Sequence, residues 1–198
     1  YVVVPLFVPS SVEEQRSIAV GSTPDAVVHV GLNEHATMTW ALHNDGSIYV
    51  RRLTDGRVIR RLEVPDAAGL RCWAFGISDD RCAFGYADGS VRYGRLGFDT
   101  EFIDRDEAPQ ALRVLSRGES APYRDGMAQR TPEDQFRYQF LTLEMSEPLA
   151  LAAEPIVRLD QTTGNRGTVF AALDAAGLVH VRQVRERRNL LTGETTRR

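Results

Sequence analysis

Lysine is absent from this sequence, and cysteine is scarce. All 24 basic residues are arginines. Chemistry that needs an amine, such as a Schiff base or the lysine of a Walker-type phosphate loop, is therefore excluded. The two cysteines, Cys72 and Cys82, are too few for a disulfide framework and lack the spacing of a zinc site. If both lie in one hairpin, with Cys72 opposite Ala83, their side chains point to opposite faces of a sheet.

The chain also lacks an excess of positive charge. A net charge of −3 and a pI near 5.8 argue against a nucleic-acid partner, because a phosphate-binding surface leaves a basic excess. Its apolar start is far shorter than the about 20 residues that span a bilayer, and Pro5 interrupts it. Two interpretations of this start stay open: a buried edge strand, or the end of a membrane helix.

Motifs of catalysis and metal binding are missing as well. There is no Gly-x-Ser-x-Gly elbow, and the carboxylate runs fall where turns are expected. Three histidines, His29, His35 and His43, lie in one expected hairpin, but a turn near Glu34 places His29 opposite Trp40 and keeps the three apart. We therefore predict no enzyme, no metal and no cofactor. A propeller hydrolase would need these carboxylates and histidines to meet at a ring centre.

What the sequence does contain is a repeated turn signal between runs that alternate apolar and polar residues. An Asp-Gly pair followed by such a run marks the tip of an antiparallel hairpin, and a two-residue loop of this kind needs positive φ at both central residues. The turn positions are 43, 45 and 43 residues apart when an Asp in the Thr-Pro-Glu-Asp turn takes the place of glycine. They are Gly46, Gly89, Asp134 and Gly177. We refer to them as the turn slots.

The residues after the slots share one pattern. Positions two, four and seven residues after each slot are apolar or aromatic, and those between are mostly polar, which is typical of a strand with one buried face. Two places after the slots stand Ile48, Val91, Phe136 and Val179; four places after stand Val50, Tyr93, Tyr138 and Val181; seven places after stand Leu53, Leu96, Leu141 and Val184.

A further Asp-Gly turn in the first unit indicates four strands per repeat, and a unit of about 43 residues has the size of a propeller blade. The sequence thus predicts an all-β, propeller-like array of about four four-stranded antiparallel blades, possibly a partial propeller, with at most one short helix near Pro109. We expect an N-terminal segment, 1–20, and a β domain, 21–198. Its blades are expected at 26–64, 70–104, 109–153 and 155–198.

Partner contacts are predicted in two places. Arg185, Arg187 and Arg188 are weak candidates for an anion or partner contact beside the last hairpin, although alternating Arg and Glu on an exposed strand also prevents edge pairing. Four blades need not close into a ring. Apolar faces left open at the ends of an arc would favour pairing with a second copy, so a homodimer is a further possibility.

Several segments carry a resemblance to a known family. The stretches "VVVPLFVPSSVE", "MAQRTPEDQFRYQFLTLEMSEP" and "LDAAGLVHVRQVRERRNLLTGE" resemble the enlarged N-terminal extracytoplasmic region of permease subunits of phosphate-type ABC transporters in proteobacteria. The blades are also similar to WD-repeat blades in size and turn placement, without the Gly-His and Trp-Asp signatures. Nothing in the chain matches a membrane core or an ATPase-contacting loop.

The resemblance implies a non-catalytic binding or regulatory domain of an ABC importer permease for phosphate uptake. Such a domain would lie on the periplasmic side of the inner membrane, attached by segments outside 1–198. Segment 1–20 would then follow a membrane helix, and the partners would be other transporter subunits or the solute-binding protein. The alternative is a soluble, propeller-like scaffold for protein interactions that is unrelated to transport.

Overall fold

The computed structural model describes residues 17, 19, 26–76, 80–164 and 167–184, together with the backbone of 186–188 and 195–197. The predicted fold class is confirmed: the protein is all-β, and its sheets are antiparallel. Within the described part, α1 (Gln110–Arg113) is the single α-helix, and Pro109 directly precedes it as expected. Apart from residues 17 and 19, the predicted segment 1–20 lies outside the described residues.

The first sheet reproduces the predicted first unit. Its strands pair in sequence order, which makes a four-stranded antiparallel meander of the kind that forms one propeller blade. The strands are β1 (Val27–Leu32), β2 (Met38–His43), β3 (Ser47–Arg52) and β4 (Val58–Glu63). The 3-10 turn η2 (Ala67–Gly69) then leads to the second sheet.

The second sheet combines the predicted blades 70–104 and 109–153, which are therefore not separate sheets. Its strands are β5 (Leu70–Phe75), β6 (Arg81–Tyr86), β7 (Ser90–Ile103), β8 (Ser120–Tyr123), β9 (Gly126–Arg130), β10 (Phe136–Met145) and β11 (Leu149–Ala150). The physical reason is the length of β7. Its first half pairs with β6 and β11, and its second half continues past β6 to pair with β10.

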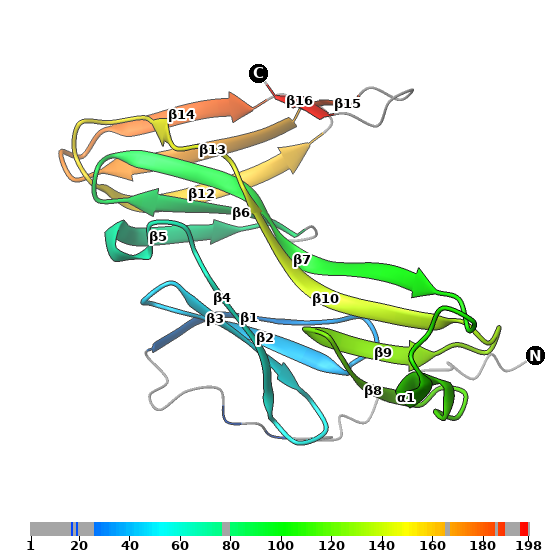
Figure 1. The fold of residues 1–198 in the computed structure, drawn as a ribbon. Helices are drawn as coiled ribbons and strands as arrows, with labels where there is room; N and C mark the ends of the chain where they lie inside the picture. The colour runs from blue at the N-terminus through cyan, green and yellow to red at the C-terminus, as the bar shows by residue number, and fades with distance from the viewer. Residues whose placement is uncertain are drawn as a thin grey trace, which may run out of the picture.

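Close backbone approach holds this long pair together. A Cβ atom at Gly94 would lie 1.8 Å from the carbonyl oxygen of Glu144, so only glycine lets β7 begin its pairing with β10 there. Figure 1 shows β7 and β10 running together out of the stack of sheets toward α1. The third predicted unit is thus a lateral extension of the second sheet rather than a layer of its own.

The predicted unit 155–198 also divides. The third sheet contains β12 (Ile156–Gly164), β13 (Gly167–Asp174) and β14 (Val179–Val184), while β15 (Glu186–Arg188) and β16 (Thr195–Arg197) pair with each other. Gly164 and Gly167 pair at the end of the β12–β13 hairpin. No fourth strand joins β14 among the described residues.

The four turn slots have the same geometry. Gly46, Gly89, Asp134 and Gly177 all have positive φ, at 81°, 77°, 72° and 84°. Each slot N–H donates to the carbonyl three residues earlier, and five residues separate the last paired residues of the two strands at every site. The expectation that both central residues have positive φ was wrong. Only the last loop residue is left-handed, as in a type I turn followed by a G1 bulge.

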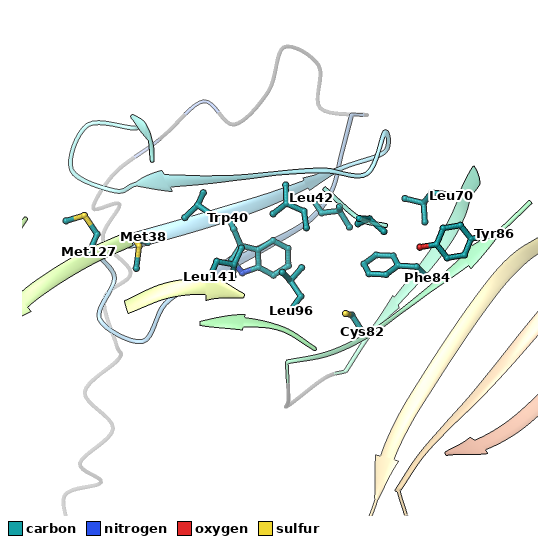
Figure 2. Packing of buried hydrophobic residues seen from close by; sticks show 13 residues of the cluster. Met38, Trp40, Leu42, Leu70, Cys82, Phe84, Tyr86, Leu96, Met127 and Leu141 are labelled. Carbon is teal, nitrogen blue, oxygen red and sulfur yellow. The ribbon is translucent and has the colours of Figure 1, made fainter. Parts of the chain in front are cut away.

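Three layers are stacked: the first sheet, the part of the second sheet that contains β5 and β6, and the third sheet (Figure 1). The core between the first and second layers is the largest and is shown in Figure 2. A second core, around Phe170 and Ile156, lies between the second layer and the third sheet. A third, around Phe136 and Leu112, lies under α1.

The number of places between a residue and its slot decides which face of the sheet that residue occupies. Residues two places after a slot face the following layer: Ile48 lies in the core between the first and second layers, and Val91 in the core between the second and third. Residues seven places after face backward, since Leu96 lies in the first of these cores and Val184 in the second. We call the side that carries positions two and four the forward face of a sheet.

The carboxylates beside the slots are held ionised by hydrogen bonds. The backbone N–H of Ser47 lowers the pKa of Asp45, and the Ser90 hydroxyl lowers the pKa of Asp88. The Arg130 guanidinium does the same for Asp134. Each hydrogen bond favours the charged form and ties a turn to an adjoining strand.

Stability is therefore expected to fall in acid. A carboxylate whose folded pKa is depressed contributes stability that is present above its unfolded pKa of 3.8 and is lost as the pH falls through the folded pKa. Thermal unfolding followed from neutral pH to about pH 2 should show a melting temperature that falls below about pH 4. The double variant Asp45→Asn/Asp88→Asn should show a smaller drop, and an unchanged drop would contradict this role.

Candidate interaction surface

The forward face of the third sheet carries an open apolar surface. Strand register places Leu173 beside Val179 and Ala171 beside Val181, so these four side chains lie on the same side of the sheet. Val179 is 64% exposed and Val181 59% exposed, and Leu178 in the adjoining turn is 60% exposed. We call Leu173, Ala171, Val179 and Val181 the forward patch.

Equivalent residues in the other units are covered. Ile48, Val91 and Phe136 stand two places after their slots, as Val179 does, and all three are fully buried. Val50, four places after its slot as Val181 is, is also fully buried. The chain thus uses one residue pattern throughout, and only the third sheet lacks a layer over its forward face within the described residues.

Polar side chains surround the patch. Arg158 pairs with Leu173 and Asp160 with Ala171, so both lie beside the patch on β12, and Gln183 lies beyond Val181 on β14. An apolar centre within a polar border is the usual anatomy of a protein interface. Isolated exposed apolar residues need no explanation, but a contiguous set of this kind marks a contact surface.

The turn beneath Leu178 is held by a buried carboxylate. Asp174 is 3% exposed; one of its oxygens accepts from the backbone N–H of Leu178 at 2.9 Å, and the other lies 2.9 Å from His180 Nε2. Both contacts lower the pKa of Asp174, with the His180 contact contributing most. The turn therefore holds the start of β14, and with it Val179, on a fixed backbone, which reduces the entropy lost on binding.

The patch also adjoins an unpaired strand edge. In the described part of the chain β14 pairs with β13 alone, whereas the equivalent strand β3 has β4 on its other side. An edge strand offers unpaired backbone N–H and C=O groups. A partner could thus meet both the apolar face and the backbone edge of β14.

The arginines predicted as partner contacts follow β14 in the sequence. Arg185 lies outside the described residues. Arg187 and Arg188 are described only by their backbone, which belongs to β15. Their role stays a prediction.

The three histidines do not meet. His29 stacks on Phe75, His35 lies 2.6 Å from Glu34, and the His43 ring packs edge-on against Tyr49. The expected pairing of His29 with Trp40 was wrong, because His29 pairs with Leu42.

The loop between β1 and β2 explains the shift of two residues. Asn33 Oδ1 accepts from the N–H groups of Thr37 and Met38, which makes the loop longer than a turn centred on Glu34. In the residues described, no three His, Cys, Asp or Glu side chains are placed to hold a metal ion.

The cysteines lie on opposite faces of the second sheet, as predicted. Cys72 belongs to the core against the third sheet, and Cys82 to the core against the first. Their register differs from the expectation, because Cys72 pairs with Gly85 rather than Ala83. Burial raises the pKa of Cys72 to about 11 and that of Cys82 to about 12, so neither thiol is a reactive nucleophile.

Comparisons with known proteins give little beyond architecture. No protein-family model matches the sequence, and no curated protein matches it. Among solved structures, the chain is similar to the Cps50 (Swd1) beta-propeller domain of Myceliophteria thermophila, at 10% sequence identity and a TM-score of 0.38. The match covers 87% of this chain and 38% of that one, so this chain spans less than two fifths of its length.

A search of the described residues for helices long and apolar enough to cross a membrane finds none.

Proposed function

We propose that this protein is a non-catalytic binding module that docks a β-sheet of a partner protein on the forward patch. The observation that carries the proposal is the contrast between Val179, which is 64% exposed, and Ile48 and Val91, which occupy the same place in their units and are fully buried. The partner takes the place that a following layer occupies elsewhere in the stack.

The chemistry of the partner surface can be inferred from the contact between the second layer and the third sheet. In the core between the second layer and the third sheet, aliphatic Ile156 and aromatic Phe170 meet small side chains such as Ala83. A sheet that covers the forward patch therefore needs aliphatic or aromatic side chains at alternate positions along its strands. At the border of the patch, an acidic group of the partner would pair with Arg158, and a basic group would pair with Asp160.

In a head-to-tail pair, a second copy of this chain fits the patch less well than a different protein does. The outer face of the first sheet, which would have to meet it in a head-to-tail pair, carries Tyr49 between two guanidinium groups. Arg51 lies 5.9 Å and Arg61 5.4 Å from the centre of that ring. Such a cationic face gives no aliphatic complement to Val179 and Val181.

Site-specific photo-crosslinking tests this proposal. A benzoylphenylalanine placed at Val179 should capture a defined partner in cells, whereas the same group at Val30, which is 57% exposed on β1, should not. With the captured protein purified, Val179→Asp/Val181→Asp should weaken binding at least tenfold, equivalent to about 1.4 kcal/mol. Val30→Asp is the matched control and should leave the affinity unchanged.

Two results would overturn the proposal. One is equal capture from positions 179 and 30, and the other is binding that survives the double substitution. The crosslink at position 179 could also capture a second copy of this chain. If the double variant then abolished a dimer in solution, the patch would be a self-association surface and the proposed partner protein would be ruled out.

A second candidate places this module in an ABC importer. The resemblance of "LDAAGLVHVRQVRERRNLLTGE" and its companion segments to permease extracytoplasmic regions supports this candidate. The partner sheet would then belong to another subunit or to the solute-binding protein, on the periplasmic side of the membrane. Pull-down of the full-length protein from solubilised membranes should recover a transporter component, and recovery of none would count against this candidate.

A further inference from the structure

A cavity lies at the junction between the first sheet and β7, away from the forward patch. Its volume is about 170 Å³. Residues from four parts of the chain line it: β1, β2, the facing ends of β5 and β6 with Phe75, Gly76 and Asp80, and β7. Figure 2 shows two of the lining side chains, Trp40 and Leu96, side by side between the sheets.

Aromatic rings make up much of the wall. His29 stacks on Phe75, with 3.9 Å between ring centroids and 8° between planes. Trp40 lies 5.5 Å from His29 and 6.0 Å from Phe75. Phe98 adds a fourth ring. Burial lowers the pKa of His29, so this ring is uncharged at neutral pH and brings no positive charge to the cavity.

Glycines bring the polar and aromatic groups close to the backbone. A Cβ at Gly31 would lie 2.3 Å from Trp40 Nε1, and a Cβ at Gly97 would lie 2.1 Å from an Asp80 carboxylate oxygen. Gly76 also lines the cavity. No side chain from these three positions occupies the cavity, and any larger residue at Gly31 or Gly97 would displace the indole or the carboxylate.

The charge beside the cavity is negative. Asp80 Oδ2 lies 3.3 Å from an Arg95 guanidinium nitrogen, and a second nitrogen of the same group is held by Asp99 at 2.5 Å. One guanidinium thus faces two carboxylates. The Asp80 side chain is 52% exposed, so its carboxylate can meet a ligand from solvent.

From this geometry we infer a binding site for a small organic cation, a quaternary ammonium group, that sits against the aromatic rings with Asp80 as its counter-charge. Aromatic faces attract cations that are weakly hydrated, and a methylated ammonium gains this attraction without needing hydrogen-bond acceptors. The group can belong to a free small molecule or to a trimethylated lysine side chain. This site goes beyond the proposed function, because it is formed by other strands.

The test uses ligands matched in shape and different in charge. The intact protein is titrated with tetramethylammonium, with choline, with a short trimethyl-lysine peptide, and with 3,3-dimethylbutanol, the neutral isostere of choline. Binding is read from the chemical shift of the Trp40 indole N–H, assigned by comparison with Trp73. Choline should bind, and the neutral isostere should bind at least fivefold more weakly. Stronger binding of the peptide than of choline would identify a side-chain ligand.

Substitution of Asp80 tests the contribution of its negative charge to ligand binding without disturbing the fold. Asp80→Asn should weaken choline binding about fivefold and leave the melting temperature nearly unchanged, because the side chain is half exposed. Asp106→Asn, at an exposed carboxylate before α1, is the control and should change neither quantity. Absence of shifts with every ammonium ligand, equal binding of the neutral isostere, or an unaltered affinity in Asp80→Asn would each overturn the inference.

Discussion

Replacing Phe84 by alanine is expected to lower the free energy of unfolding by about 3 to 5 kcal/mol. Phe84 is fully buried on β6, faces the first sheet and meets Phe75 edge-on at 6.1 Å. Its ring lies beside Leu70 and Tyr86 in the middle of the core that joins the first two layers (Figure 2). Removing the ring leaves a cavity that a β-sheet cannot collapse to fill, so the transfer and cavity terms add.

The control is the same substitution on the surface. Phe102 on β7 is 61% exposed, so Phe102→Ala should change stability by no more than about 0.5 kcal/mol. Chemical denaturation followed by circular dichroism gives both values. If Phe84→Ala does not purify, Phe84→Leu should still cost about 1 kcal/mol. Similar losses for Phe84→Ala and Phe102→Ala would show that the first two layers do not pack as described.

Alanine at Gly89 is expected to cost about 3 kcal/mol. About 1 kcal/mol comes from the left-handed conformation, since φ is 77°. The remaining about 2 kcal/mol comes from steric overlap, because a Cβ there would lie 2.1 Å from the carbonyl oxygen of Ala152. The overlap cannot relax easily, because the Gly89 carbonyl also accepts from the N–H groups of Leu151 and Ala152.

Gly177 separates the two contributions. It has a φ of 84°, and a Cβ there would meet nothing within 4 Å. Gly177→Ala should therefore cost only the about 1 kcal/mol of the backbone conformation. Equal losses at the two glycines, measured by urea denaturation, would contradict the close approach of the 149–152 segment to the turn at Gly89.

The local part of this fold could be predicted from the sequence, because turns and strand alternation depend on neighbouring residues. Asp134 is the clearest case: it was placed in a glycine slot from spacing alone, and its φ is 72°. Register was less predictable. The side chain of Asn33 binds the N–H of Thr37 and so sets the length of a loop that composition does not reveal.

Long-range pairing and exposure could not be predicted. The pairing of β7 with β10 depends on a contact between segments that α1, β8 and β9 separate in the sequence. Val179 has the same local pattern as Ile48, and the two differ in exposure because no layer covers the forward face of the third sheet among the described residues. The cavity beside Trp40 draws on four distant segments, and none of them carries a motif.

Hydroxyl-radical footprinting, read residue by residue by mass spectrometry, tests the central claim that three layers pack in one direction and leave the last forward face open. On this chain alone, Leu178, Val179 and Val181 should oxidise at the rates of exposed side chains, while Ile48 and Val91 should be strongly protected. Protection of Val179 equal to that of Ile48, or rapid oxidation of Ile48 and Val91, would contradict the account.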